Sequence, residues 1–274
     1  MTVSERFNAL MENLNLTADQ AADGETKHKG VRRCLNRHYY DWVSDTANSR
    51  LVGSWGKSTR IRPPRDIDVL FVLPESVFHR YQQRPGNKQS QLLQEVKGVL
   101  QATYTSTNMS GDGQVVVVPF LSYAVEVVPA FLLQSGQYWI CDTNNGGRYK
   151  ETDPKAEIEK VSASNDATNG NSRRLIRMMK RWQEYCNVPL KSFLIELLAI
   201  EFLGSWAYAA KSATYHDWMV RDFLAFLVSK ANSFVIVPGT YEIVWLGDAW
   251  KSRAETALGR ARAACENEAG GYPC

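Results

Sequence analysis

Residues 51–74 read LVGSWGKSTRIRPPRDIDVLFVLP, and this stretch decides the fold. It contains the pair Gly53 and Ser54, and then Asp66 and Asp68 at the start of an apolar run. The composition of DIDVLFVL predicts a strand, and the side-chain period of two places both aspartates on one face. Because burying two carboxylates costs free energy unless a cation meets them, the stretch predicts a cation at the beginning of a strand.

The composition is that of a globular protein with a substantial core or two lobes. The chain has 274 residues, of which 44% are hydrophobic and 22% are charged, so a disordered or fibrous protein is excluded. The formal charge of +3 is too small to indicate a general nucleic-acid coat, although local basic clusters can still bind phosphates.

The five cysteines are scattered and form no C-x-x-C pair, so neither a disulfide framework nor a zinc ribbon is predicted. The first residues, MTVSERFNALMENLN, lack the layout of a secretion signal, and we expect a protein of the reducing cytoplasm. The most apolar stretch, residues 192–210, carries Glu196 and Glu201, which favours a packed helix over a membrane span.

Strand and helix patterns separate along the chain. A long or broken helix is predicted over residues 17–44, with Thr17 as its cap. Residues 113–131 contain two β-rich runs that predict adjacent antiparallel strands, with Glu126 inside the second run and Pro119 and Pro129 at strand ends or on an edge. A loop is predicted over 80–89, a helix over 90–104, and an irregular connection over 141–172.

After residue 172 the pattern becomes helical. Apolar residues recur at helical spacing in four segments, and a short extended piece, residues 233–246, precedes the last of them. The four predicted helices cover residues 172–186, 190–206, 216–231 and 249–268.

Two carboxylates on one strand and a third from a neighbouring strand suit a pair of hard divalent cations. Magnesium binds carboxylate oxygens together with waters and substrate phosphates, and two such ions can clamp an in-line phosphoryl displacement. A Gly-Ser turn would let backbone N–H groups approach a phosphate. Each feature also has a simpler interpretation, because Asp-x-Asp is a common turn device and Glu126 could face solvent. The ordered combination favours the metal site.

That ordered set resembles the signature of the nucleotidyltransferase superfamily of DNA polymerase β type. The runs VGSWGKSTRIRPPRDIDVLFVL, VEVVPAF, YWICDTNNGGRYKETDP, LIRMMKRW and PLKSFLIELL further resemble the bacterial CD-NTases, relatives of cyclic GMP-AMP synthase and oligoadenylate synthase. The resemblance implies an α+β fold with a polymerase-β-like core, in which a mixed sheet is flanked by helices, over residues 1–165. A helical lobe over residues 166–274 would complete a bilobed protein with a central cleft.

The resemblance also implies roles for individual residues. Asp66, Asp68 and Glu126 would be catalytic ligands of two Mg²⁺ ions, for which Mn²⁺ can substitute, and Glu126 would serve the ion that activates the acceptor hydroxyl. Many relatives carry aspartate at the third position, and glutamate can still ligate the ion. Gly53 and Ser54 would lie beside the nucleotide phosphates.

In the helical lobe, the resemblance places Lys180 at the triphosphate, Ser192 near its terminal phosphate and Phe193 near a base. The alternatives are a solvated basic helix face and a core position for Phe193. Three further arginines precede the aspartates and would either steer nucleotides or RNA to the site or form ion pairs with its acids. They are Arg60, Arg62 and Arg65.

The function implied by the resemblance is condensation of ribonucleoside triphosphates, ATP and possibly GTP, UTP or CTP, into a cyclic di- or trinucleotide second messenger for anti-phage, CBASS-type defence. Regulatory or C-terminus-modifying CBASS proteins are the expected partners, no membrane is expected, and RNA is left open. Two alternatives also remain open at this point. One is nucleotidyl transfer to an RNA, protein or small-molecule acceptor, and the other is a noncatalytic sensor of RNA or protein.

Overall fold

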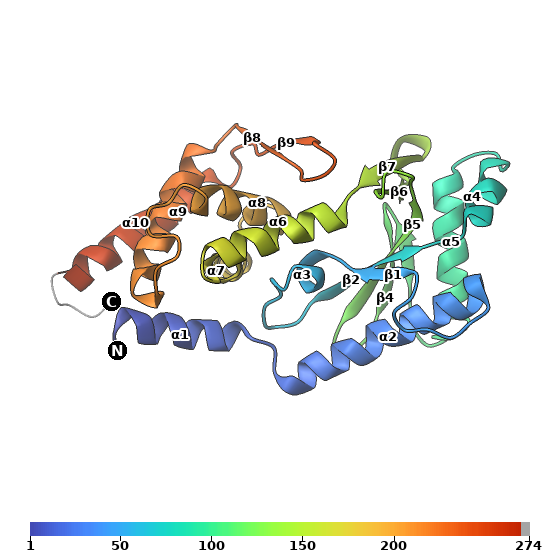
Figure 1. Ribbon diagram of the computed structural model, residues 1–274, viewed down its shortest axis with the longest axis horizontal. Coiled ribbons are helices and arrows are strands. Elements are labelled where there is room, and N and C mark those ends of the chain that lie inside the picture. The colour runs from blue at the N-terminus through green and yellow to red at the C-terminus, as the bar shows by residue number, and fades with distance from the viewer. Residues whose placement is uncertain (270–274) are drawn as a thin grey trace. The chain divides into compact units, whose positions relative to one another are not determined.

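The computed structural model describes residues 1–269 (Figure 1), and the C-terminal GGYPC segment, which includes Cys274, lies outside the described residues. The chain divides into two compact units. The sheet unit comprises residues 16–58 and 63–156, and the helical unit comprises, of the described residues, 1–15, 59–62 and 157–269. A single division after residue 165 was predicted, whereas the structure joins the first 15 residues to the C-terminal part of the chain.

A seven-stranded mixed sheet forms the centre of the sheet unit. Its path is β1-β2-β5-β4-β3, and β6 pairs with both β5 and β7. The β2 and β5 strands are parallel, and the other pairs are antiparallel, including the predicted pair β4 and β5. The strands are β1 Ser49–Leu51, β2 Asp66–Val72, β3 Ser110–Asp112, β4 Val115–Pro119, β5 Ala124–Leu132, β6 Tyr138–Asp142 and β7 Arg148–Thr152.

Helices pack against this sheet and bury the apolar side chains of β2, β4 and β5. The predicted N-terminal helix forms as one continuous helix, α2. Thr17 caps its first turn, where the side chains of Thr17 and Gln20 each accept a hydrogen bond from the other residue's backbone N–H. Its Gly24 allows close packing, since a Cβ there would lie 2.7 Å from Cη2 of buried Trp55. The helices of the sheet unit are α2 Ala18–Tyr40, α3 Gly53–Gly56, α4 Glu75–Gln82 and α5 Lys88–Gln101, with a 3₁₀ turn at Asn144–Gly146.

The helical unit surrounds a second apolar core. Its helices are α1 Val3–Leu14, α6 Pro154–Ala167, α7 Asn171–Tyr185, α8 Ser192–Leu203, α9 His216–Ser229 and α10 Lys251–Ala269. A 3₁₀ turn at Ala213–Tyr215 precedes α9, and a two-stranded hairpin is formed by β8 Phe234–Ile236 and β9 Ile243–Trp245. The α6 helix begins in the sheet unit and continues into the helical unit.

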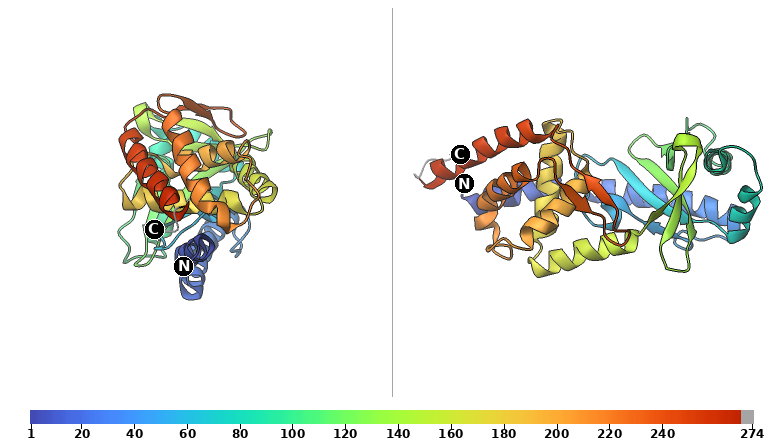
Figure 2. Two further views of the ribbon diagram at one scale, coloured as in Figure 1. Left: turned by 90° about the vertical axis from the view of Figure 1, so that its left-hand side faces the viewer. Right: turned by 90° about the horizontal axis from the view of Figure 1, so that it is seen from above.

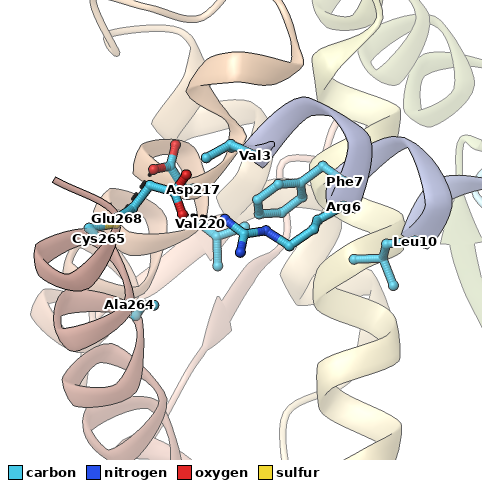
Figure 3. Close-up of a pocket in the computed structure, with 10 residues that line it drawn as sticks. Val3, Arg6, Phe7, Leu10, Asp217, Val220, Ala264, Cys265 and Glu268 are labelled. Carbon is cyan, nitrogen blue, oxygen red and sulfur yellow. Dashed lines mark hydrogen bonds and ion pairs between the residues drawn. The ribbon is translucent and has the colours of Figure 1, made fainter. Parts of the chain in front are cut away.

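The α1 helix belongs to the helical unit because it packs beside α7, α9 and α10 (Figure 2). Figure 3 shows Phe7 and Leu10 of α1 lining a cavity of about 310 Å³ together with Val220 of α9. The Arg6 guanidinium forms an ion pair with Glu268 of α10 across this cavity. The two ends of the described chain are therefore held together within one unit.

Three local predictions were wrong. Residues 141–172 are not irregular, because β6 and β7 form a hairpin and α6 begins at Pro154 after the Asp153 side chain accepts the Ala156 N–H. The predicted loop over 80–89 shortens to residues 83–87, because α4 and α5 extend into it. Both segments are polar, and polar composition is also typical of loops.

Pro129 lies inside β5, not at a strand end or sheet edge as predicted. On the edge of β5 that faces away from β2, residues up to Val127 pair with β4 and residues from Ala130 onward pair with β6. The antiparallel partner therefore changes around Pro129. A residue without an N–H is tolerated at such a gap in the ladder.

The four described cysteines, Cys34, Cys141, Cys186 and Cys265, are free. The apolar helix α8 packs into the core of the helical unit, with Glu196 buried on it. Among residues 1–269, no helix is long and apolar enough to cross a membrane.

Candidate active site

The three predicted metal ligands lie on two neighbouring strands of the sheet unit. Asp66 and Asp68 occupy alternate positions of β2, and Glu126 is the direct register partner of Asp68 on the parallel strand β5. Asp66 pairs in register with Ala124, two residues before Glu126. Since paired residues of adjacent strands project on the same face about 5 Å apart, the sheet brings the three acids together.

Burial and charge both act on the Glu126 carboxyl. Burial raises its pKa, and the neighbouring charges of Asp68 and Asp66 raise it further, to about 7. Asp66 is exposed, whereas Asp68 and Glu126 are partly buried. At neutral pH this carboxyl is close to half protonated, so a cation placed among the three acids would complete its ionisation.

The Gly-Ser turn is held directly against these acids. The Val52 N–H donates to the Asp68 carbonyl oxygen at 3.0 Å, which ties the turn to β2. Gly53 has a φ of +53°, and a Cβ added there would lie 1.9 Å from Asp68 Oδ2. Glycine is therefore required at this position for conformational and steric reasons. The α3 helix begins at Gly53 itself and has only four residues.

The acids do not form a finished metal site. As the side chains stand, no group of three or more histidine, cysteine, aspartate or glutamate residues in the described part of the chain is arranged to hold a metal ion. The donor set nevertheless fits magnesium, because all three groups are hard oxygen ligands. The charges of Asp68 and Asp66 also act on Glu126 and raise its pKa, so the three carboxyl groups are neighbours. Magnesium commonly takes only one or two carboxylates and completes its shell with waters and substrate phosphate.

The other predicted contacts belong to the helical unit. Lys180 is buried on α7, where its Nζ donates to Glu196 Oε1 at 2.5 Å and to Thr59 Oγ1 at 2.9 Å. Thr59 in turn donates to the same Glu196 oxygen at 2.8 Å. The Lys180 ammonium is thus engaged by a buried carboxylate, and its contact with a triphosphate stays a prediction.

Ser192 is the first residue of α8, and its hydroxyl donates to Gln183 Oε1 at 2.8 Å. Phe193 is partly buried and packs against the core of the helical unit, as the alternative interpretation allowed. The roles of both residues at a nucleotide stay predictions.

The basic residues of α7 are largely engaged within the helical unit. Arg173 donates to Ser162, Arg174 donates to the Asn169 carbonyl, and Arg181 forms an ion pair with Glu184. Arg177 donates to Asn15 at 2.7 Å, and burial followed by the charge of Arg60 lowers the pKa of Arg177. The basic side chains of α7 therefore serve in part to hold the helical unit together.

Sequence reasoning missed Glu196 as the partner of Lys180, although it used this residue against a membrane span. The available signal was a carboxylate in the middle of an apolar helix, which needs a buried cation or hydrogen-bond donors. The role of Thr59 had no comparable signal, because only the folded chain places residues 59–62 in the helical unit.

The fold is that of the polymerase-β-like nucleotidyltransferases. The structure resembles Escherichia coli DncV in its 3′-deoxy GTP bound form, with a TM-score of 0.70 and 14% identity over 93% of this chain and 88% of that one. It also resembles CdnC from the CdnC:HORMA-deltaN complex of E. coli MS115-1, with a TM-score of 0.64 and 18% identity over 96% and 88% of the two chains.

The family model described as the Second Messenger Oligonucleotide or Dinucleotide Synthetase domain, SMODS, matches residues 1–165. The chain belongs to this family, and with it to the bacterial CD-NTases. A probable cyclic nucleotide synthase of Bacillus cereus strain VD146 is 22% identical over 184 residues. That alignment covers 57% of this chain and 56% of the relative, so the chain matches little more than half of the relative's length.

Proposed function

We propose that this protein joins ribonucleoside triphosphates into a cyclic di- or trinucleotide second messenger. The observation that carries the proposal is the pairing of Asp68 with Glu126 on parallel strands, with Asp66 on the same face and Gly53 against Asp68. A clustered set of acids beside a glycine turn has no evident structural benefit, but it suits a nucleotide that arrives with divalent cations. Membership of the SMODS family supports the same assignment.

Asp66, Asp68 and Glu126 are the residues that would hold two Mg²⁺ ions, or Mn²⁺ in their place. When bound, these ions would neutralise the phosphates and lower the pKa of the attacking hydroxyl. A ribose 2′ or 3′ hydroxyl would give up its proton to solvent water as its oxygen bonds to an α-phosphorus, and the bond from that phosphorus to the departing pyrophosphate would break. The Gly53 backbone, which leaves no room for a Cβ beside Asp68 Oδ2, would help to orient this carboxylate.

A role in CBASS-type anti-phage defence is part of the proposal, and ATP, GTP, UTP and CTP are the candidate substrates. Support comes from the nucleotide in the DncV relative and the HORMA protein in the CdnC complex. A regulatory protein, or one that modifies the C-terminus, would be a partner of this chain by the same analogy. We place the activity in the cytoplasm, where nucleoside triphosphates are made.

The test is incubation of the protein with all four labelled triphosphates and Mg²⁺ or Mn²⁺, without another acceptor. A phosphatase-resistant product is expected, and nuclease digestion with mass spectrometry identifies its bases and linkages. The matched control is Glu75→Gln, which removes an exposed carboxylate at the start of α4 that belongs to none of the three predicted ligand positions.

Other outcomes would redirect the proposal. Labelling only of an added RNA, protein or small molecule would favour nucleotidyl transfer to that acceptor. Failure to label anything, combined with partner binding that survives an Asp66→Asn and Asp68→Asn double substitution, would favour a noncatalytic sensor.

A further inference from the structure

The β8–β9 hairpin of the helical unit exposes an unusual amount of apolar surface. Phe234 is 44% exposed, Tyr241 78% and Trp245 69%, and two isoleucines of the hairpin are about half exposed. Scattered apolar residues are normal on a protein surface, but a contiguous group of large ones marks an interaction site. We call this surface the hairpin face, and it consists of Phe234, Ile236, Tyr241, Ile243 and Trp245.

The register of the hairpin leaves the outer edge of β8 unpaired. Hydrogen bonds join Leu246 N–H to the Ser233 carbonyl and Val237 N–H to the Glu242 carbonyl. Antiparallel pairs alternate between bonded and non-bonded, so the backbone groups of Phe234 and Ile236 point away from β9. Within residues 1–269 these backbone groups make no hydrogen bond, and β8 is an edge strand of its two-stranded sheet.

A groove of about 1120 Å³ runs along this edge. Six consecutive residues of the hairpin segment, 233–238, line it, as expected when the edge of a strand faces the groove. The opposite walls come from α6 and α8, and their apolar contributions include Leu197 and Ile200. The groove therefore offers both an apolar floor and a row of unused backbone donors and acceptors.

The charged lining of the groove has an excess of one positive charge. Lys230 forms an ion pair with Glu201 at 2.5 Å, and Lys160 of α6 is a second, exposed lysine. Two lysines and one glutamate leave one cation without a counter-ion among the lining residues. An occupant with a carboxylate near Lys160 would match this charge.

We propose that the groove binds an extended segment of a partner protein, which adds to β8 as a third strand. Such a segment would accept and donate backbone hydrogen bonds at Phe234 and Ile236, and its alternate side chains would continue the hairpin face on one side and meet Leu197 on the other. Its chemistry is alternating apolar residues with one acidic residue. This docking surface is separate from the acids of the sheet unit and does not depend on the proposed synthase activity.

A strand fits the groove better than the other occupants. A helix satisfies its own backbone groups and would leave the β8 edge unused. Nucleic acid requires many cations, whereas this groove has a surplus of one. A second copy of the chain would meet the hairpin face with an identical apolar surface, but it would bring the same surplus of positive charge to the groove.

The experiment selects peptides from a random phage-displayed library on the full-length protein, and synthesises an enriched sequence with a fluorescent label for anisotropy. We expect enriched peptides to alternate apolar residues and to carry an acidic residue. Binding should weaken about tenfold or more when alternate peptide nitrogens are methylated, because methylation removes strand donors.

Ile236→Lys should weaken binding by a similar factor, and this side chain is already half exposed, so the fold should tolerate the change. Tyr185→Ser removes another exposed apolar side chain, 79% exposed at the end of α7, and should leave binding unchanged. Thermal unfolding and nucleotide condensation by Ile236→Lys should match the unmodified protein.

The proposal is overturned if no peptide is enriched, or if enriched peptides bind Ile236→Lys as tightly as the unmodified protein. Sedimentation velocity measures whether the protein forms a dimer through this edge. A dimer that Ile236→Lys dissociates would also overturn the proposal and assign the edge to self-association.

Discussion

The Lys180 ammonium lies 2.5 Å from Glu196 Oε1, and both side chains are buried in the helical unit, at 7% and 3% exposure. Thr59 hydrogen-bonds to both partners, so the pair also fixes the short segment 59–62 to α7 and α8. The same lysine was predicted to contact a triphosphate. Its structural role and its predicted catalytic role can be separated, because the structural role requires Glu196 as a buried ion-pair partner and the triphosphate contact does not.

Lys180→Met should lower the free energy of unfolding by about 3–5 kcal/mol, since it removes the ammonium group that hydrogen-bonds to the buried Glu196 carboxylate. The double variant Lys180→Met with Glu196→Leu should recover most of this loss, because it removes the buried carboxylate as well. Urea unfolding measures both values. Equal stability of the single and double variants would contradict a buried ion pair.

The double variant also tests the predicted nucleotide contact. If Lys180 reaches the triphosphate, KM for the nucleotide should rise about tenfold while the fold stays intact, which corresponds to ~1.4 kcal/mol of lost binding. An unchanged KM in the stable double variant would restrict Lys180 to its structural role.

Glu126 should make stability depend on pH when no divalent cation is present. Its folded pKa of about 7 lies above the ordinary carboxyl value of 4.5, so the folded state holds this proton more tightly than the unfolded state. The contribution is therefore fully present below pH 4.5 and is lost as the pH rises through 7. After allowance for solvent screening of a partly exposed group, the loss should be about 1–2 kcal/mol.

Glu126→Gln should remove this contribution, so the variant should be more stable than the unmodified protein at pH 8 and equal to it near pH 4. The measurement is urea unfolding from pH 4 to pH 8 in the presence of a chelator. Added Mg²⁺ should stabilise the unmodified protein at pH 8 more than the variant. Parallel pH profiles of the two proteins would disprove the raised pKa of Glu126.

Asp68→Asn should lower kcat/KM for nucleotide condensation at least a hundredfold, because it removes a charged oxygen ligand next to Glu126. A hundredfold loss corresponds to ~2.7 kcal/mol of transition-state stabilisation. Glu75→Gln should retain full activity. Product formation by Asp68→Asn at the unmodified rate, in the same magnesium titration, would remove this residue from the site.

Gly53→Ala should nearly abolish activity, because the new Cβ would lie 1.9 Å from Asp68 Oδ2 and must displace that carboxylate. The matched control is Gly247→Ala, at φ +60° with no atom within 4 Å of the added Cβ. Backbone strain is similar at the two positions, so activity assays and thermal unfolding should separate strain from displacement. Similar effects of both substitutions on activity would refute the steric explanation.

The sequence predicted much of the sheet unit because its signals are local. Alternation in DIDVLFVL located β2 and the shared face of its aspartates, and Thr17 marked the start of α2. Residues 141–172 escaped this reasoning, because a polar hairpin and a weakly amphipathic helix have the composition of loops.

By itself, the sequence determined which residues carry the acids, the glycine turn and the apolar faces, because side-chain chemistry and short-range periodicity are written in the chain. Only the tertiary structure decided that Asp68 pairs with Glu126, that Lys180 is held by Glu196, and that residues 1–15 join the helical unit. These relationships join residues distant in sequence, and their free energy comes from packing, register and desolvation, which exist only once the chain has folded.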